Sequence, residues 1–155
     1  MTRIEGRTTF ARTPEVVFDF LADPRHEPSY NPLIVSAHKV TPGPIGSGTR
    51  FVQRVKRLGR VSEVTIDLVE HHRPHHLGWH ITSSSMDVHG NEDLTAEDGG
   101  TQVHWVWDFA SRGPLRLLGP LVGLAGSRLE QRVWVNMKET LDAAPSSQSR
   151  SAPPG

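Results

Sequence analysis

Cysteine is absent from the 155-residue chain, and this absence excludes several kinds of site at once. Without thiols there is no disulfide framework, no thiolate nucleophile and no structural zinc–thiolate centre. The chain also has no net charge, because it contains 17 basic and 17 acidic residues. We therefore expect no nucleic-acid partner, since such binders use net basicity to attract phosphates.

Long hydrophobic runs are missing as well. No stretch of about 18 apolar residues occurs, so we expect no stable membrane insertion. The first residues lack the apolar core of a signal peptide, and we expect a cytoplasmic protein. The length favours one domain, residues 1–143. Residues 144–155 are mostly Ser, Pro and Ala, and this composition predicts a disordered tail.

The hydrophobic pattern changes period along the chain, which predicts both strands and helices. Thr13-Pro14-Glu15 is typical of a helix start with Thr13 as N-cap, and prolines limit the following stretch to a second short helix. Strand-like alternation occupies seven segments: 3–10, 34–41, 49–57, 60–70, 77–84, 86–96 and 101–110. A final helical period runs through Leu118, Val122, Ala125, Leu129, Val133, Met137 and Leu141.

An antiparallel sheet with one apolar face needs a cover. The last helix is the one predicted element that is long and apolar enough to supply it. The sequence therefore predicts an α+β fold in which a curved antiparallel sheet of about seven strands wraps round a long C-terminal helix. Two short helices follow the first strand and close one end.

Strand alternation also predicts which side chains face the helix. Asp98-Gly99 suits a two-residue type I′ hairpin, and Ser84-Ser85 suits a second tight turn. With these turns, Gly90 lies between two inward indoles and makes room for the rings or for a ligand. The main inward set is Phe51, Gln53, Val55, Val64, Ile66, Leu68, Leu77, Trp79, Ile81, Ser83, Thr101, Val103, Trp105, Trp107 and Phe109.

Glu92 is the most distinctive inward position, because its neighbours on that face are apolar. An unpaired buried carboxylate is costly, so Glu92 should be paired or have a raised pKa. A raised pKa is what a general acid or base needs at neutral pH. The alternatives are that Glu92 reaches solvent, that Gln53 or Tyr30 hydrogen-bonds it, or that a bulge turns it outward.

Several motifs have simpler explanations than a functional site. The glycine-rich loop 43–48 precedes a strand and lacks the Gly-Lys-Ser/Thr ending, so we expect no phosphate site. The histidine-rich segment 71–76 contains Pro74, which forbids the helix that its spacing would need to chelate a metal. His80 and His89 should face each other on the outer side of the sheet. We expect no metal, and we expect Trp134 to pack helix against sheet.

Five basic residues lie on the two sides of the predicted hairpin near residue 58. We expect this basic cluster to be a solvated outer surface, with recognition of an acidic partner as the alternative. Its members are Arg50, Arg54, Lys56, Arg57 and Arg60.

The predicted order of elements, with particular stretches, resembles the START-like helix-grip (SRPBCC) superfamily, most closely its polyketide cyclase/dehydrase and lipid-transport branch. The matching stretches are residues 12–24, Tyr30-Asn31-Pro32, residues 43–51 and residues 100–105, and the resemblance extends to about residue 143. It implies a cavity between sheet and helix that accepts apolar ligands. Some members of this superfamily are cyclases or dehydratases.

Three functions remain open at this point. The first is binding of a hydrophobic small molecule, polyketide-like or lipid-like, with no cofactor. The second is a cyclase or dehydratase that uses Glu92 and Tyr30 as acid and base. The third is a protein-interaction domain with a filled cavity. The oligomeric state stays open, and the candidate ligand-binding residues are Phe51, Gln53, Trp79, Gly90, Trp105, Trp107, Leu118, Val122, Ala125 and Leu129.

Overall fold

Seven antiparallel strands form one sheet, in the order β1-β7-β6-β5-β4-β3-β2. The structure is a computed structural model that describes residues 2–113 and 119–143, with side chains of the last helix described from residue 127. The predicted strand bounds differ from the observed ones by at most two residues. The strands are β1 (Thr2–Phe10), β2 (Ile34–Lys39), β3 (Arg50–Arg57), β4 (Arg60–His72), β5 (His76–Thr82), β6 (Met86–Glu97) and β7 (Gly100–Ser111).

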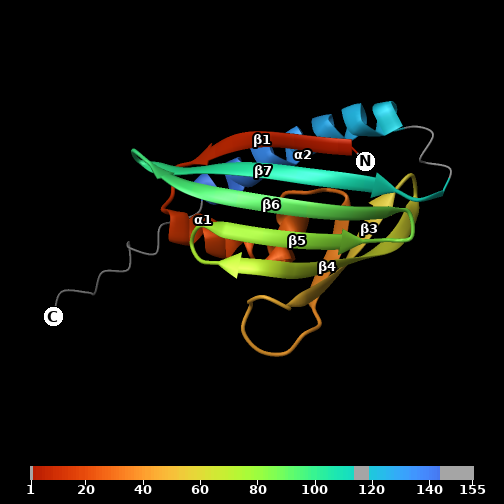
Figure 1. The fold of residues 1–155 in the computed structure, drawn as a ribbon, viewed down its shortest axis with the longest axis horizontal. Helices are drawn as coiled ribbons and strands as arrows, with labels where there is room; N and C mark the ends of the chain where they lie inside the picture. Colours follow the sequence, from red (N-terminus) through yellow and green to blue (C-terminus); the bar gives the residue numbers. More distant parts are fainter. Residues whose placement is uncertain (1, 114–118, 144–155) are drawn as a thin grey trace.

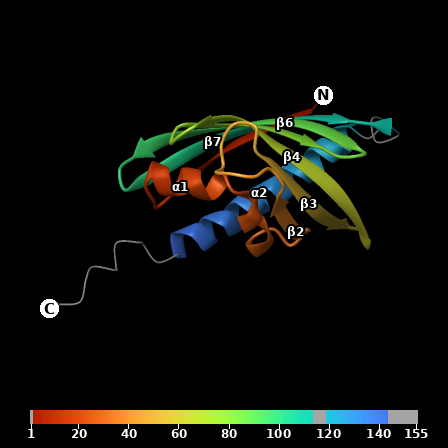
Figure 2. The same cartoon turned by 90° about the horizontal axis from the view of Figure 1, so that it is seen from below.

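One long helix covers one face of this sheet. Helix α2 (Gly119–Ala143) runs behind the strands in Figure 1 and crosses beneath the curved sheet in Figure 2. Helix α1 (Pro14–Leu21) and the 3₁₀ helix η1 (Pro24–Ser29) lie on the same side as α2. The predicted α+β architecture, with two short helices after the first strand, is confirmed.

The two short helices begin where the sequence places them. Pro14 opens α1 after Thr13, which is the N-cap in an extended conformation, although its side chain makes no capping hydrogen bond. Asp23 caps η1, because its Oδ1 accepts a hydrogen bond from the backbone N–H of Arg25 at 3.1 Å. Pro28 lies inside η1 and has no N–H to donate, which limits this segment to a short helix.

Two interruptions of the strand pairing help to curve the sheet. The register shifts between Ile34 and Ser36 of β2, and again between Leu68 and Glu70 of β4. Such bulges bend a strand and increase its twist. The curvature brings the edge strand β2 round toward α2, as Figure 2 shows.

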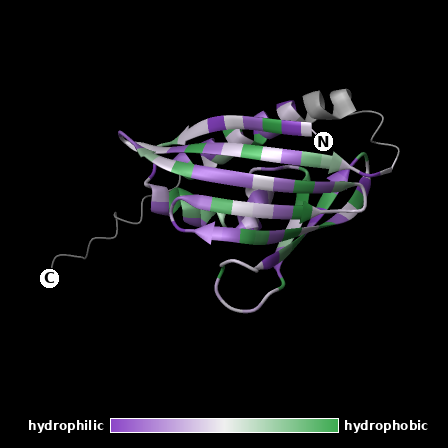
Figure 3. Cartoon of the chain, viewed as in Figure 1, coloured by the Kyte–Doolittle hydropathy of each residue, from purple (hydrophilic) through white to green (hydrophobic). Residues whose placement is uncertain are grey.

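The alternation of side chains follows the predicted pattern. Bands of hydrophilic and hydrophobic residues alternate along the strands in Figure 3. Gly90 pairs with Trp107 on one side and with Trp79 on the other, as the two hairpin turns predict. A Cβ built at Gly90 would lie 1.8 Å from Cζ3 of Trp107, so the indole ring fills the space that glycine leaves.

The turn types depart from the prediction at one hairpin. A type I′ turn needs positive φ at both central residues. Leu58 and Gly59 meet this condition, with φ of 49° and 75°. In the Asp98-Gly99 hairpin, Gly99 alone takes a positive φ, so the two-residue connection is confirmed but its type I′ assignment is wrong.

The C-terminal end of α2 is tied to the segment between β1 and α1. The Arg12 guanidinium donates hydrogen bonds to the backbone carbonyls of Leu141 at 3.2 Å and Asp142 at 3.1 Å. The Asp142 carboxylate accepts from the backbone N–H of Ala11 at 3.0 Å. These bonds satisfy carbonyls that a helix end leaves without partners. They attach the C-terminal end of α2 to residues that directly follow β1.

The predicted apolar stripe of α2 is buried at Val133, Met137 and Leu141, which join one core with Phe10 and Phe18. The predicted tail, residues 144–155, and Leu118 lie outside the described residues. The side chains of Val122 and Ala125 also lie outside them.

Leu141→Ala tests whether this stripe anchors the helix. Leu141 is buried and does not line the cavity described below, so its truncation should lower the free energy of unfolding by about 2–5 kcal/mol. Urea denaturation measures the loss. Glu139→Ala on the exposed face of the same helix is the control and should change stability by less than about 0.5 kcal/mol. Equal losses for the two variants would show that the face is misassigned.

Candidate functional site

A cavity of about 210 Å³ lies between the concave face of the sheet, helix α2 and η1. Its walls are mainly aliphatic and aromatic, with a small number of carboxyl, amide and hydroxyl groups. This composition is typical of sites for small molecules. The wall residues include Leu21, Tyr30, Ile34, Gln53, Val55, Ile66, Trp79, Ile81, Val88, Glu92, Trp107, Phe109, Leu129, Val133, Trp134 and Met137.

The structure brings together six of the residues proposed from the sequence. Tyr30 and Glu92, the proposed acid–base pair, both line the cavity, and so do the proposed ligand-binding residues Gln53, Trp79, Trp107 and Leu129. Three other proposed binding residues lie outside its walls. Phe51 is buried in the core, Gly90 is covered by the Trp107 ring, and Trp105 packs behind the wall.

Glu92 is buried and hydrogen-bonded to the indole of Trp79. It projects from the middle of β6, is 4% exposed, and accepts a hydrogen bond at Oε2 from Nε1 of Trp79 at 3.0 Å. Burial raises its pKa to about 8, because desolvation outweighs the hydrogen bond from Trp79. Glu130 and Glu27 raise this pKa further by repulsion. At neutral pH the Glu92 carboxyl is therefore mainly protonated.

Two more carboxyls share the cavity. Glu27 comes from η1 and Glu130 from α2. Burial raises the pKa of Glu27 to about 7, an effect that the nearby Gln53 amide opposes and Glu130 reinforces. Burial also raises the pKa of Glu130, opposed by the indole N–H of Trp134, which donates to Oε1 at 2.9 Å. Both side chains are partly exposed and line the cavity.

Tyr30 adds a phenol group to this wall. It is buried at the end of η1, and its carbonyl accepts a hydrogen bond from Nδ2 of Asn136 on α2 at 3.2 Å. Burial and then repulsion by Glu27 and Glu92 raise the pKa of its hydroxyl well above the usual value. The phenol therefore stays protonated and keeps a proton that it can donate in a hydrogen bond.

Two buried donors on the cavity wall have no hydrogen-bond partner among the described residues. They are Nε2 of Gln53 and Nε1 of Trp107. The Gln53 amide lies close enough to Glu27 to lower the pKa of that carboxyl, yet its geometry falls short of a hydrogen bond. Buried polar groups are normally satisfied, so unsatisfied donors that face a cavity are available to a ligand.

Trp134 has a larger role than the sequence indicated. Its ring stacks on Trp105 at a centroid distance of 5.5 Å, which confirms the predicted packing of helix against sheet. It also lines the cavity and hydrogen-bonds Glu130. Glu130 and Trp134 lie three residues before Val133 and Met137 of the predicted stripe, and so widen that stripe on one side. That spacing is the signal that would have identified Glu130.

Glu27 was missed for a different reason. It lies in a segment rich in proline, where neither strand nor helix periodicity assigns a face. Its direction is set by the capped η1 helix and by the packing of η1 beside β2. No pattern in the sequence indicates this direction.

The outer face of the sheet carries ionic groups unconnected to the cavity. His80 and His89 stack at 4.4 Å, as their predicted pairing requires, and both direct Nε2 to Oδ1 of Asp87, at 2.9 and 3.5 Å. The ligand atoms of these three residues lie within 4.8 Å of one another, the spacing that a metal ion needs. Asp87 is already paired with Arg112 at 2.9 Å.

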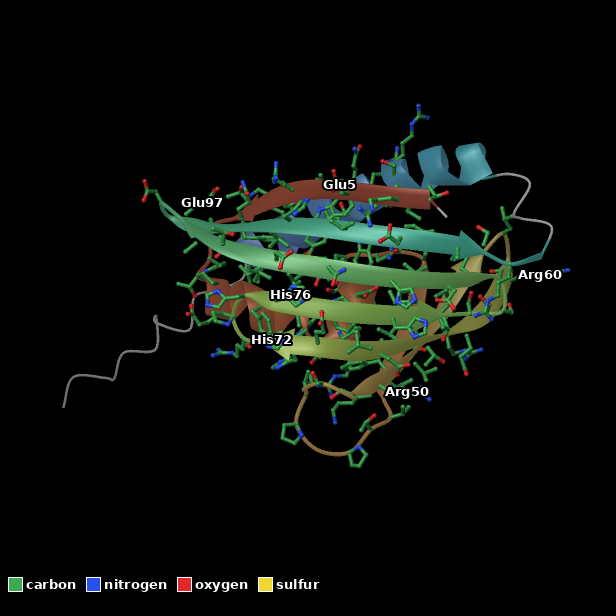
Figure 4. All side chains as sticks on the ribbon, in the orientation of Figure 1. Glu5, Arg50, Arg60, His72, His76 and Glu97 are labelled. Carbon is green, nitrogen blue, oxygen red and sulfur yellow. The ribbon has the colours of Figure 1, made fainter. Side chains whose placement is uncertain are left out.

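His76 lies at one end of the sheet beside His72 (Figure 4) and bridges Glu70 and Asp93 at 2.8 and 2.6 Å. Burial alone would lower the pKa of His76, but these two hydrogen bonds outweigh it and raise that pKa. His76 is thus occupied by two carboxylates on the outer face.

No helix in the described part of the chain combines the length and apolar character needed to cross a bilayer. The basic residues Arg50 and Arg60 lie on exposed ends of β3 and β4 (Figure 4). Arg50 is paired with Asp67 at 2.7 Å. The basic cluster is thus exposed, as predicted.

Comparison with solved structures shows a shared fold at low sequence identity. A START superfamily protein from Mycobacterium smegmatis has a TM-score of 0.77 at 11% identity, over 92% of this chain and 98% of that chain. Ara h 8.0201 has a TM-score of 0.74 at 20% identity, over 92% and 98%. A protein from Thermus thermophilus has a TM-score of 0.74 at 17% identity, over 93% and 99%.

Sequence comparison assigns the family. A search of proteins with curated descriptions finds no match. A family model described as polyketide cyclase / dehydrase and lipid transport matches residues 1–142, the whole of the sheet and nearly all of α2. The chain therefore belongs to the polyketide cyclase/dehydrase and lipid transport family.

Proposed function

We propose that the protein binds a hydrophobic or amphipathic small molecule in the cavity between the sheet and α2. The observation that carries the proposal is the cavity itself, about 210 Å³ of space walled by apolar side chains with a few polar groups directed into it. Protein interiors are otherwise closely packed, so a space of this size in the core favours a ligand. The alternative of an interaction domain requires a filled cavity instead.

The size and the walls favour a compact ligand with ring character. Trp79, Trp107 and Trp134 present aromatic surfaces from β5, β7 and α2. Aromatic rings stack on or edge against such surfaces. The chain belongs to a family described by polyketide cyclases and lipid transport, and this membership also supports a hydrophobic ligand.

Tryptophan fluorescence tests the proposal directly. The probe is 2-methyl-1,4-naphthoquinone, an uncharged two-ring diketone that quenches indole emission and that finds no cysteine in this chain to modify. We expect saturable quenching, because three of the four tryptophans line the cavity. Trp107→Phe and Trp134→Phe should each remove part of the quenched signal.

Trp105→Phe is the matched control, because Trp105 lies behind the wall and its loss should leave most of the quenching in place. Circular dichroism establishes that each variant is folded. Quenching that rises linearly with probe concentration in the wild type, without saturation, would contradict the proposed binding site.

Acid–base catalysis is a second candidate function, and the near-neutral pKa of Glu92 favours it. A carboxyl with a pKa of about 8 inside a cavity can both donate and accept a proton at neutral pH. Tyr30 would act beside it as a protonated hydrogen-bond donor to a carbonyl or hydroxyl oxygen. Cyclase and dehydratase chemistry needs this kind of proton transfer.

The raised pKa of Glu92 predicts a pH-dependent stability. The folded state holds the Glu92 proton up to about pH 8, whereas the unfolded chain releases it near the ordinary value of 4.5. Stability is therefore full at low pH and is lost as the pH rises toward 8. Glu92→Gln removes this dependence, so the variant should gain on the order of 1–3 kcal/mol relative to wild type between pH 5 and pH 8.

Urea unfolding at the two pH values measures this difference. Glu97→Gln, at the exposed end of the same strand (Figure 4), is the control and should follow the wild type. If Glu92→Gln also follows the wild type at both pH values, the pKa of Glu92 is ordinary and the acid–base candidate fails.

A further inference from the structure

We propose that the cavity selects compact ring compounds that carry a protonated amine. This inference rests on the proposed binding function and adds the charge of the ligand. It follows from the acidic groups of the cavity, their anchoring, the aromatic walls and one buried amide that has no partner among the described residues.

Three carboxyls reach the cavity from three separate elements. Glu27 belongs to η1, Glu92 to β6 and Glu130 to α2. All three line the same cavity, and repulsion by Glu130 raises the pKa of both other carboxyls. Three anions around one apolar space are costly unless a cation offsets them.

Neighbouring N–H groups hold two of these carboxyls in place. Trp79 donates to Oε2 of Glu92, and Trp134 donates to Oε1 of Glu130. Each indole occupies one carboxylate oxygen, and the Trp107 indole also lies near enough to Glu130 to lower the pKa of that carboxyl. The arrangement favours a ligand that donates hydrogen bonds, as an ammonium group does.

The cavity offers little positive charge of its own. Among the described wall residues, Arg57 is the single basic side chain, and it is exposed at the end of β3. His76 of β5 lies on the outer face of the sheet, where it is paired with Glu70 and Asp93. Within the described part of the chain, the acidic wall groups therefore lack a matching cation.

The aromatic walls suit a cation as well as a ring. Trp79, Trp107, Trp134 and Tyr30 surround the same space as the three carboxyls. The faces of such rings attract ammonium groups, most strongly where water is excluded. Carboxylates and ring faces together therefore select a cationic ligand over a neutral or anionic one of the same shape.

Gln53 provides an independent indication of a polar ligand. Its side chain is 3% exposed and lines the cavity, and its Nε2 has no hydrogen-bond partner among the described residues. In the proposed complex, the ammonium group donates a hydrogen bond to Oε1 of Gln53 and stabilises the ionised form of Glu27. The Nε2 group of Gln53 then donates to the Glu27 carboxylate. Both ends of the amide are then satisfied.

Binding of a cation must be linked to pH, because it requires carboxylates. The titratable groups that face Glu92 across the cavity are Glu27 from η1, Tyr30 at its end and Glu130 from α2, while His76 of β5 acts on it from the outer face of the sheet. With a pKa of about 8 for Glu92, an ammonium ligand has to displace its proton at neutral pH. Binding should therefore release protons and should strengthen as the pH rises from 6 to 8.

Isothermal titration calorimetry with three matched probes tests the inference. The probes are 1-naphthylmethylamine, 1-naphthalenemethanol and 1-naphthoic acid, which share a ring system and are cationic, neutral and anionic at pH 7. We expect the amine to bind at least about tenfold more tightly than the alcohol. Titrations in phosphate and in Tris, which differ in ionisation enthalpy, should show proton release with the amine alone.

Two variants connect this selectivity to the carboxyls. Glu92→Gln keeps the shape of the side chain and should reduce the preference for the amine to less than about threefold, without weakening the alcohol. Glu130→Gln, at the less buried carboxyl, should reduce it in the same direction if Glu92→Gln fails to fold. Glu97→Gln on the same strand as Glu92 is the control and should keep the full preference.

Each outcome decides between the two proposals. If the alcohol or the acid binds as tightly as the amine, the cation preference is overturned while the proposed binding function stands. If affinity for the amine is unchanged between pH 6 and 8 and no proton is released, the preference is overturned in the same way. If none of the three probes binds the folded protein, both proposals fall.

Discussion

The contact between α2 and the sheet is the interaction on which the rest of the structure depends. Trp134 stacks flat on Trp105, with an angle of 5° between the rings, at the centre of this contact. Arg12 holds the end of the helix through two backbone carbonyls. The cavity lies between the sheet and the helix that these contacts hold together.

The polar groups of the cavity follow from the same geometry. A sheet with strict alternation places Glu92 inward once Val88 and Leu94 are inward, and the helix then closes over it. Protein design would avoid a buried carboxyl, because desolvation is costly. Here the cost is reduced by the Trp79 hydrogen bond and by keeping the proton. The carboxyls of Glu27 and Glu130 add to it, so the acidic character of the cavity lowers stability and requires a functional explanation.

The glycines of the central strands show how the walls are shaped. A Cβ at Gly90 would collide with Trp107, and a Cβ at Gly6 would lie 2.4 Å from Cζ2 of Trp105. These two indoles therefore lie flat over strand backbone that has no side chain. Trp107 lines the cavity, and Trp105 stacks on Trp134. Gly90 thus makes room for Trp107 at the cavity wall, and Gly6 makes room for Trp105 in the core.

The strand positions, the register of the central hairpins, the long covering helix and the inward direction of Glu92 could all be predicted from the sequence. These features follow from periodicity and short turns, which are local properties of a chain. The tertiary structure alone decided that Glu27 and Glu130 join Glu92, that Trp134 lines the cavity, and that Phe51 and Trp105 do not. Each of these depends on where one element crosses another, and no periodicity within an element contains that information. The depth of burial, which sets the pKa of each carboxyl, is decided at the same crossings.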